Sequence, residues 1–206
     1  MIKLLKSLNV ESEFKNNIIN LSPKKPKENY ASYDLVRKMR ASFLVMGPLL
    51  ARYGNAKVSL PGGCAIGDRP INIHLDGFKK MGVRFLIEDG YVIGHIKGAL
   101  IGNEINLPIR SVGATENIMM AATLALGRTI ITNAAKEPEI IDLGNFLQSM
   151  GAKISGLGTD EISVIGVSKL CGSEYSIMSD RIEAGTFILL VLGCSGFLKL
   201  TNLDEK

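Results

Sequence analysis

The stretch ATENIMMAATLALG, residues 114–127, leads into a strand at 129–133, and these twenty residues show the pattern that decides the fold. The part before Gly127 is apolar around much of its circumference, which is typical of a buried helix. A glycine and a short strand follow it. Residues 114–133 therefore predict a buried helix, a turn and a strand, in that order.

This order of elements occurs three times in the chain, which indicates an internal repeat. The copies are Arg40–Tyr53 with Gly54 and 56–60, residues 114–126 with Gly127 and 129–133, and residues 182–195 with Gly196 and 197–202. The three glycines lie 73 and 69 residues apart.

A second unit, an amphipathic helix followed by a turn and two strands, repeats with the same two spacings. Its turn positions are Asn9, Gly82 and Gly151, and Asn and Gly tolerate the left-handed conformation that ends a helix. We therefore expect an α/β fold of three repeats of about 70 residues, with the longer helices inside and sheets wrapped around them. Residues 1–206 are expected to form a single domain. The first repeat looks incomplete and the third stops after its strand, so truncation at both ends is expected.

Composition sets limits on the function. Hydrophobic residues make up 46% and charged residues 21% of the 206-residue chain, as in ordinary globular proteins. The formal net charge of +4 fits either a mildly basic surface or a site for small anions. Lys and Arg are scattered and not interleaved with aromatic residues, which disfavours nucleic-acid binding. The densest basic cluster, residues 24–28, is interpreted as a solvated loop.

Location and cofactor content follow from what the sequence contains. Cys64, Cys171 and Cys194 are too widely spaced for a disulfide framework or a zinc site, and reduced thiols favour the cytoplasm. The first residues do not resemble a signal peptide, and the longest apolar stretches are too short to span a bilayer. We expect no metal, no cofactor and no membrane association.

The loop PGGCAIGDRP, residues 61–70, is the first candidate for chemistry. Its glycines leave Cys64 with little side-chain cover, and Arg69 is near enough in sequence to lower the pKa of the thiol and to hold an anion. A buried structural cysteine is the alternative. The pattern favours covalent or acid–base chemistry on an anionic substrate, without naming a reaction.

A second candidate loop, residues 109–115, precedes the long helix of the second repeat. Ser111 is suited to capping that helix, and Gly113 permits close approach of the backbone. A plain helix cap and a site that holds a diphosphate at the positive helix end are both compatible with the sequence. For His74, a structural role and a binding role both stay open.

Several motifs resemble those of the UDP-N-acetylglucosamine 1-carboxyvinyltransferases, a family of enolpyruvyl transferases. They are LPGGCAIGDRP at 60–70, YDLV at 33–36, MRAS at 39–42, SVGATEN at 111–117, NAAKEPE at 133–139 and DRIEAGT at 180–186. The resemblance covers nearly the whole chain, more loosely at 11–30. It implies an inside-out α/β barrel-type domain of three βα repeats, which would be one of two such domains in the family's fold.

The resemblance also implies an activity. The enolpyruvyl group of phosphoenolpyruvate would pass to the 3-hydroxyl of UDP-N-acetylglucosamine with release of phosphate, the first committed step of peptidoglycan synthesis. Cys64 would protonate phosphoenolpyruvate, form an adduct with it and be the target of fosfomycin, and Arg69 would bind phosphate or carboxylate. The implied substrate-binding residues are Arg40, Arg69, Pro70, Ile71, Asn72, Ile73, His74, Ile109, Arg110, Ser111, Val112 and Gly113.

The sequence departs from the family in two ways. Ile109 stands where the family has a basic residue, for which Arg110 could substitute. The family's Lys-Asn pair and its second domain, with a catalytic Asp and an anion-binding Arg, are absent from the 206 residues. Three hypotheses therefore stay open: an enzyme fragment inactive alone, a remnant that still binds the UDP-sugar, and one part of a split enzyme that needs a partner chain.

Overall fold

The computed structural model describes residues 1–61 and 71–203. The chain divides into two compact units, Met1–Gly172 and Ser173–Lys206. The helices of the first unit are α1 (Ile2–Ser7), α2 (Tyr33–Val36), the 3₁₀ helix η1 (Arg40–Val45), α3 (Met46–Tyr53), α4 (Asn72–Lys80), α5 (Val112–Ala122) and α6 (Pro138–Ser149). The second unit contains α7 (Arg181–Cys194).

The described strands of the first unit form two open four-stranded sheets and one hairpin rather than a closed barrel. One sheet has the order β3 (Tyr30–Ala31), β4 (Asn55–Ser59), β6 (Tyr91–His95) and β5 (Arg84–Glu88). The other has the order β7 (Glu104–Asn106), β8 (Arg128–Thr132), β10 (Glu161–Ile165) and β9 (Lys153–Ser155). The hairpin consists of β1 (Val10–Lys15) and β2 (Ile18–Pro23).

The two sheets are copies of one another, which confirms the repeat. In each sheet the first two strands are parallel and the remaining neighbours are antiparallel. The turn residues Asn9, Gly82 and Gly151 all have positive φ, at 62°, 98° and 100°. Their backbone N–H groups donate to equivalent carbonyls in the last turns of α1, α4 and α6.

The third copy of the longer unit differs from the expectation. Gly54 and Gly127 have positive φ, at 71° and 84°, whereas the left-handed residue after α7 is Ser195, at 50°. The strand expected at 197–202 does not form, so that prediction was wrong. No neighbouring strand pairs with these residues in the described part of the chain, and a lone strand leaves its backbone groups unpaired.

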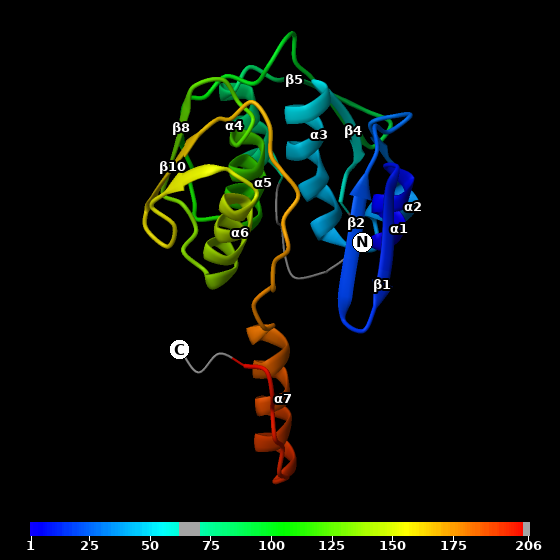
Figure 1. Cartoon of the computed structure of the whole chain (residues 1–206), viewed down its shortest axis with the longest axis vertical. Coiled ribbons are helices and arrows are strands. Elements are labelled where there is room, and N and C mark those ends of the chain that lie inside the picture. Colours follow the sequence, from blue (N-terminus) through cyan, green and yellow to red (C-terminus); the bar gives the residue numbers. More distant parts are fainter. Residues whose placement is uncertain (62–70, 204–206) are drawn as a thin grey trace. The chain divides into compact units, whose positions relative to one another are not determined.

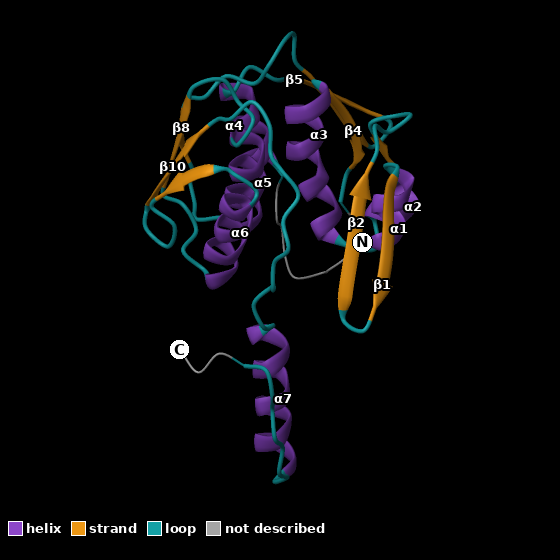
Figure 2. Ribbon diagram, viewed as in Figure 1, coloured by secondary structure: helices purple, strands orange, loops and turns teal. Residues whose placement is uncertain are grey.

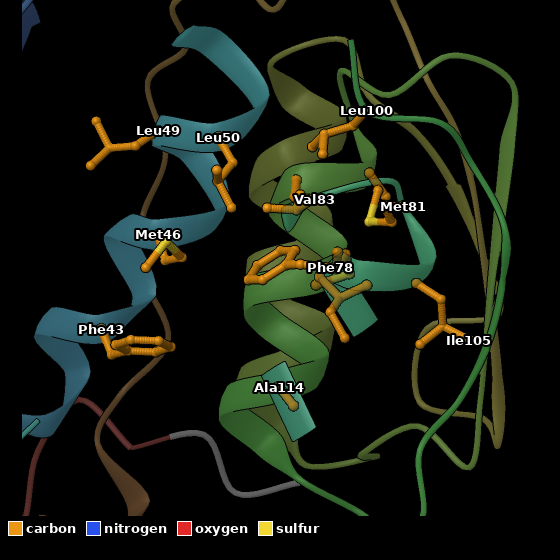
Figure 3. Close-up of a cluster of buried hydrophobic side chains, with 14 of the residues drawn as sticks. Phe43, Met46, Leu49, Leu50, Phe78, Met81, Val83, Leu100, Ile105 and Ala114 are labelled. Carbon is orange, nitrogen blue, oxygen red and sulfur yellow. The ribbon is translucent and has the colours of Figure 1, made fainter. Parts of the chain in front are cut away.

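The helices α3, α4, α5 and α6 lie between the two sheets of the first unit, as expected of the longer helices, whereas α1 and α2 lie outside, beside the hairpin (Figures 1 and 2). Seven of the eleven residues of α5 are buried, and α5 packs against α3, α4 and α6. The side chains of Phe43, Met46, Leu50 and Phe78 meet in the interior between these helices (Figure 3). The core is mainly aliphatic with two phenylalanines, which suits a chain without Trp.

The helix α7 is exposed along most of its length. Of its fourteen residues only Ala184 is buried, and Leu189 and Leu192 are 69% and 74% exposed. Among the helices of residues 1–61 and 71–203, none combines the length and apolarity needed to cross a bilayer.

Candidate functional site

The reactive loop lies partly outside the described residues. Cys64, Arg69 and Pro70 belong to residues 62–70, which lie outside the described residues. The strand β4 ends at Ser59 before this segment, and α4 begins after it, directly following Ile71. The site can therefore be built from the elements on both sides of the loop.

The start of α4 carries the next four predicted binding residues. Ile71 precedes the helix and is half-buried, Asn72 is exposed, and Ile73 and His74 are each only 7% exposed. The side chains of Ile73 and His74 belong to the interior. A ligand would therefore contact these two residues mainly through their backbone, because their side chains are buried.

The start of α5 has the predicted cap. Ser111 Oγ accepts a hydrogen bond from the Ala114 backbone N–H at 3.3 Å, and the Thr115 hydroxyl donates to the Ser111 carbonyl at 2.8 Å. The Thr115 hydroxyl in turn accepts from the Ala135 N–H at 3.1 Å. These bonds connect the 109–113 loop to residues 133–139, another of the motifs singled out in the sequence.

The starts of α4 and α5 touch through Gly113. A Cβ placed on Gly113 would lie 3.4 Å from Cε1 and 3.6 Å from Nε2 of His74. The close backbone approach expected of Gly113 is thus made to this histidine ring. The two predicted binding segments, 71–74 and 109–113, are neighbours in the folded chain.

Asn117 joins three helices at this place and was missed by the sequence reasoning. Its Oδ1 accepts from the Gly47 N–H of α3 at 2.8 Å, and its Nδ2 contacts the Phe43 carbonyl and His74 Nδ1, both at 3.2 Å. Asn117 is completely buried, so all of these bonds replace water. An amide in an otherwise apolar helix was the signal that could have revealed it.

The geometry also settles the tautomer of His74. Because Nδ2 of Asn117 only donates, Nδ1 of His74 must accept, and the neutral ring carries its proton on Nε2. Burial lowers the pKa of His74 to about 4, with a further contribution from the charge of Arg40. The Phe43 ring packs edge-on against the imidazole, with centroids 5.3 Å apart.

Arg40 begins η1 and is half-buried. Its charge contributes to the lowered pKa of His74, so the guanidinium lies near that ring. The structure thus brings Arg40 into the neighbourhood of the 71–74 and 109–113 segments, as the prediction of a shared site requires.

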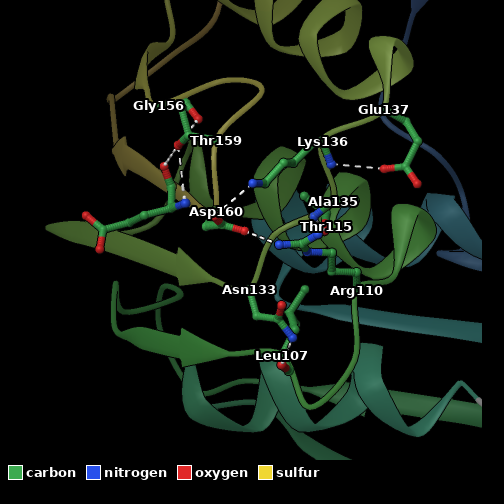
Figure 4. A network of polar contacts seen from close by, with 11 residues as sticks. Leu107, Arg110, Thr115, Asn133, Ala135, Lys136, Glu137, Gly156, Thr159 and Asp160 are labelled. Atoms are coloured by element: carbon green, nitrogen blue, oxygen red, sulfur yellow. Dashed lines mark hydrogen bonds and ion pairs between the residues drawn. The ribbon is translucent and has the colours of Figure 1, made fainter.

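Arg110 is held by an ion-pair network on the surface (Figure 4). Asp160 contacts the Arg110 guanidinium and the Lys136 ammonium, the latter at 2.8 Å. Hydrogen bonding from Lys136, with both positive charges, lowers the pKa of Asp160. Ile109 next to it is 59% exposed and contributes no charge. Arg110 is therefore the cation that this loop offers.

Glu116 is a second residue that sequence reasoning missed. It lies in the second turn of α5 and is half-buried. Burial raises its pKa to about 7, helped by the nearby charges of Glu139 and Glu137. A carboxyl group that titrates near neutrality can exchange protons under physiological conditions. Within the described residues, no group of three or more His, Cys, Asp or Glu side chains is arranged to hold a metal ion.

The repeated α/β units, with helices packed between sheets, define an enolpyruvyl transferase fold. The chain belongs to the EPSP synthase (3-phosphoshikimate 1-carboxyvinyltransferase) family, whose sequence profile matches residues 1–206. Among solved structures, the enolpyruvyl transferase NikO from Streptomyces tendae is similar, with a TM-score of 0.78 and 20% identity over 98% of this chain and 46% of that chain. EPSP synthase from Acinetobacter baumannii has a TM-score of 0.69 and 22% identity over 91% and 43% of the two chains. These likenesses confirm the predicted fold.

Relatives with higher sequence identity to this chain are UDP-N-acetylglucosamine 1-carboxyvinyltransferases. The chain is 50% identical over 204 residues to the UDP-N-acetylglucosamine 1-carboxyvinyltransferase of Idiomarina loihiensis, covering 98% of this chain and 49% of the relative. It is 52% identical over 189 residues to UDP-N-acetylglucosamine 1-carboxyvinyltransferase 1 of Halalkalibacterium halodurans, covering 92% and 43%. The resemblance stated from the motifs is confirmed. The chain spans about half the length of these relatives.

Proposed function

We propose that residues 1–206 form the Cys-bearing domain of an enzyme that transfers the enolpyruvyl group of phosphoenolpyruvate to the 3-hydroxyl of UDP-N-acetylglucosamine. The names of the relatives at about 50% identity support this assignment. One structural observation carries it. His74, near the start of α4, contacts Asn117 of α5, lies beside Gly113 of the 109–113 segment and is influenced by the charge of Arg40.

The nucleotide sugar would bind across these helix starts. The first N–H groups of α5 are not used within the helix, and the helix dipole favours a negative group there, so this end suits a diphosphate. Arg110 would supply a positive charge beside it in place of a basic residue at 109. An incoming diphosphate would compete with Asp160 for that guanidinium.

Cys64 and Arg69 would act on phosphoenolpyruvate. A base would take the proton of the sugar 3-hydroxyl as its oxygen adds to C2 of phosphoenolpyruvate, while the Cys64 thiol gives a proton to C3 and the methylene becomes a methyl group. Loss of phosphate from C2, with transfer of a C3 proton to a base, would then form the enol ether of the product. Arg69 would neutralise the phosphate or the carboxylate during both steps. The thiol would also form the covalent adduct and react with fosfomycin.

The biological role follows from this reaction. The product would feed peptidoglycan synthesis, and with it cell-wall growth, cell shape and cell division, in the cytoplasm. Because the chain spans about half the length of its relatives, we expect no turnover from the 206-residue polypeptide alone. A UDP-sugar-binding remnant and one part of a split enzyme with a partner chain are the alternative roles.

Titration of the ¹⁵N-labelled chain with UDP-N-acetylglucosamine tests the binding part. Weak binding with shifts at residues 71–74 and 109–113 is expected, and an absence of shifts up to millimolar ligand would refute it. The chemistry is tested by phosphate release from phosphoenolpyruvate in the presence of the UDP-sugar. The unaltered chain should release none alone. Release that appears on adding a chain equivalent to the rest of the relatives, and that Cys64→Ala abolishes, would identify a split enzyme.

A further inference from the structure

A cleft of about 910 Å³ opens on the first unit, at the Asn55 end of β4, whereas the 61–70 segment follows the other end of that strand. Its volume is within the range of small-molecule sites. The lining residues are Lys25, Pro26, Lys27, Glu28, Asn29, Tyr30, Arg52, Tyr53, Asn55, Ala56, Lys57, Ile93, Gly94 and His95.

The cleft is strongly basic. Lys25 and Lys27 come from the loop before β3, Arg52 from the last turn of α3 and Lys57 from β4. Glu28 is the one carboxylate among the lining residues. Cations from three separate segments thus face one concave surface.

The basic loop, residues 24–28, is exposed at every position except Pro26, as its interpretation as a solvated loop predicts, and its backbone is held in place. Pro26 is buried, and the Lys25 carbonyl accepts a hydrogen bond from Asn9 Nδ2 at 2.8 Å. On its other side Asn29 Nδ2 donates to Asn55 Oδ1 at 2.8 Å. The backbone of the loop is anchored at both ends, so its lysines extend from a fixed wall of the cleft.

The Lys57 ammonium is also placed by its neighbours. It lies 4.8 Å from the ring centroid of Tyr91 and 5.8 Å from that of Tyr30. The two tyrosine hydroxyls are joined by a hydrogen bond of 2.8 Å, which fixes the rings beneath the charge. A cation held by ring faces keeps its N–H groups available for a ligand.

The second repeat shows that the fold does not need these charges. The Lys57 N–H donates to the Asn29 carbonyl in the first sheet, and the Ile130 N–H donates to the Asn103 carbonyl at the same place in the second. By this register Lys57 corresponds to Ile130. The remaining cations Lys25, Lys27 and Arg52 correspond to Ala99, Ile101 and Ala125. Uncharged residues stand at these four positions in the second repeat, so the fold does not need the four cations of the first repeat.

We propose that this cleft is a binding site for small phosphorylated molecules, recognised through two adjacent phosphate groups. Lys25, Lys27 and Lys57 would neutralise the phosphates as point charges, and Arg52 would bind one of them with its two-pronged guanidinium. The half-buried ring of Tyr53 offers an apolar wall for whatever body the diphosphate carries. This site goes beyond the proposed transfer reaction and does not depend on it.

The probes are inorganic pyrophosphate and ADP, titrated into the ¹⁵N-labelled 206-residue chain. Both should shift the amide signals of Asn55, Gly94 and His95. The double variant Arg52→Met and Lys57→Met removes two charges but keeps the apolar stems. The dissociation constant should rise about tenfold for each cation removed, since a charge-assisted hydrogen bond has that effect. Lys153→Met, an exposed lysine on β9 of the other sheet, is the matched control and should change nothing.

The outcomes separate the possibilities. Equal affinity for pyrophosphate and ADP supports a site for the diphosphate alone, and tighter binding of ADP supports a site that also contacts the ligand's body. Shifts that avoid the cleft, an equal loss of affinity in Lys153→Met, or binding of adenosine as tight as that of ADP would each overturn the proposal. Failure of UDP-N-acetylglucosamine to shift residues 109–113 would concern the proposed reaction and leave this site untouched.

Discussion

Replacing Asn117 with leucine should destabilise the first unit severely. Both side chains have the same number of heavy atoms in the same branched arrangement, so the substitution creates little cavity. It removes the acceptor of the Gly47 N–H, at 2.8 Å, and the donor to the Phe43 carbonyl and His74 Nδ1, both at 3.2 Å. Each buried polar group left without a partner costs about 1–3 kcal/mol, so three together should cost roughly 3–9 kcal/mol. That is a large part of the roughly 5–15 kcal/mol that a domain has.

Urea denaturation followed by circular dichroism measures this loss as a lower midpoint with an unchanged slope. Thr123→Val is the matched control, because Thr123 at the end of α5 is also buried but its hydroxyl bonds locally, to the Met120 carbonyl at 2.7 Å. We expect it to cost about 1 kcal/mol. If Asn117→Leu costs no more than Thr123→Val, Asn117 does not hold the three helices together.

Three further predictions concern the same region. Gly47→Ala should cost about 1–3 kcal/mol in urea denaturation, because the new Cβ would lie 2.5 Å from both Asn117 O and Oδ1; an unchanged midpoint would contradict this. The pKa of His74 is about 4 in the folded chain against 6.5 unfolded, so the unfolded state takes up the proton first and stability should fall by about 3 kcal/mol from pH 6.5 to pH 4. His74→Gln should flatten that part of the stability profile, and an equally steep profile would count against it. Glu116 makes stability depend on pH in the opposite direction. Its pKa is raised to about 7 because the folded state disfavours the ionised carboxylate, so stability is lost as pH rises from 4.5 to 7. Glu116→Gln should therefore stabilise the chain more at pH 8 than at pH 4, and an equal effect at both would contradict the assignment.

Local signals in the sequence were enough to predict where the helices of the repeats begin and end. Asn9, Gly82 and Gly151 mark helix ends because only a few residue types tolerate positive φ, and the structure has all three there. Ser111 marked the start of α5 because its side chain can bond the first free N–H groups, which it does. Such features depend on neighbours within a few residues, so they can be read along the chain.

The candidate site was predicted only in part. The sequence singled out the segments 71–74 and 109–113, but their contact depends on Gly113 and His74, which are 39 residues apart. Asn117 stood out only as an amide in a largely apolar helix, and nothing in the sequence indicated that His74 would be its partner. The strand expected at 197–202 was wrong because strand formation requires a partner, and the repeat pattern does not report whether a partner is in place.

By itself the sequence determined the α/β repeat, the helix ends and the family to which the motifs belong, since periodicity and turn chemistry are local properties. Only the tertiary structure decided which polar groups share one place. The bonds of Asn117, the raised pKa of Glu116 and the gathering of Lys25, Arg52 and Lys57 around one cleft all depend on distances between remote segments. Packing of the helices and sheets sets those distances. Charges and hydrogen bonds act only on groups within a few ångströms, so their partners are decided by the fold.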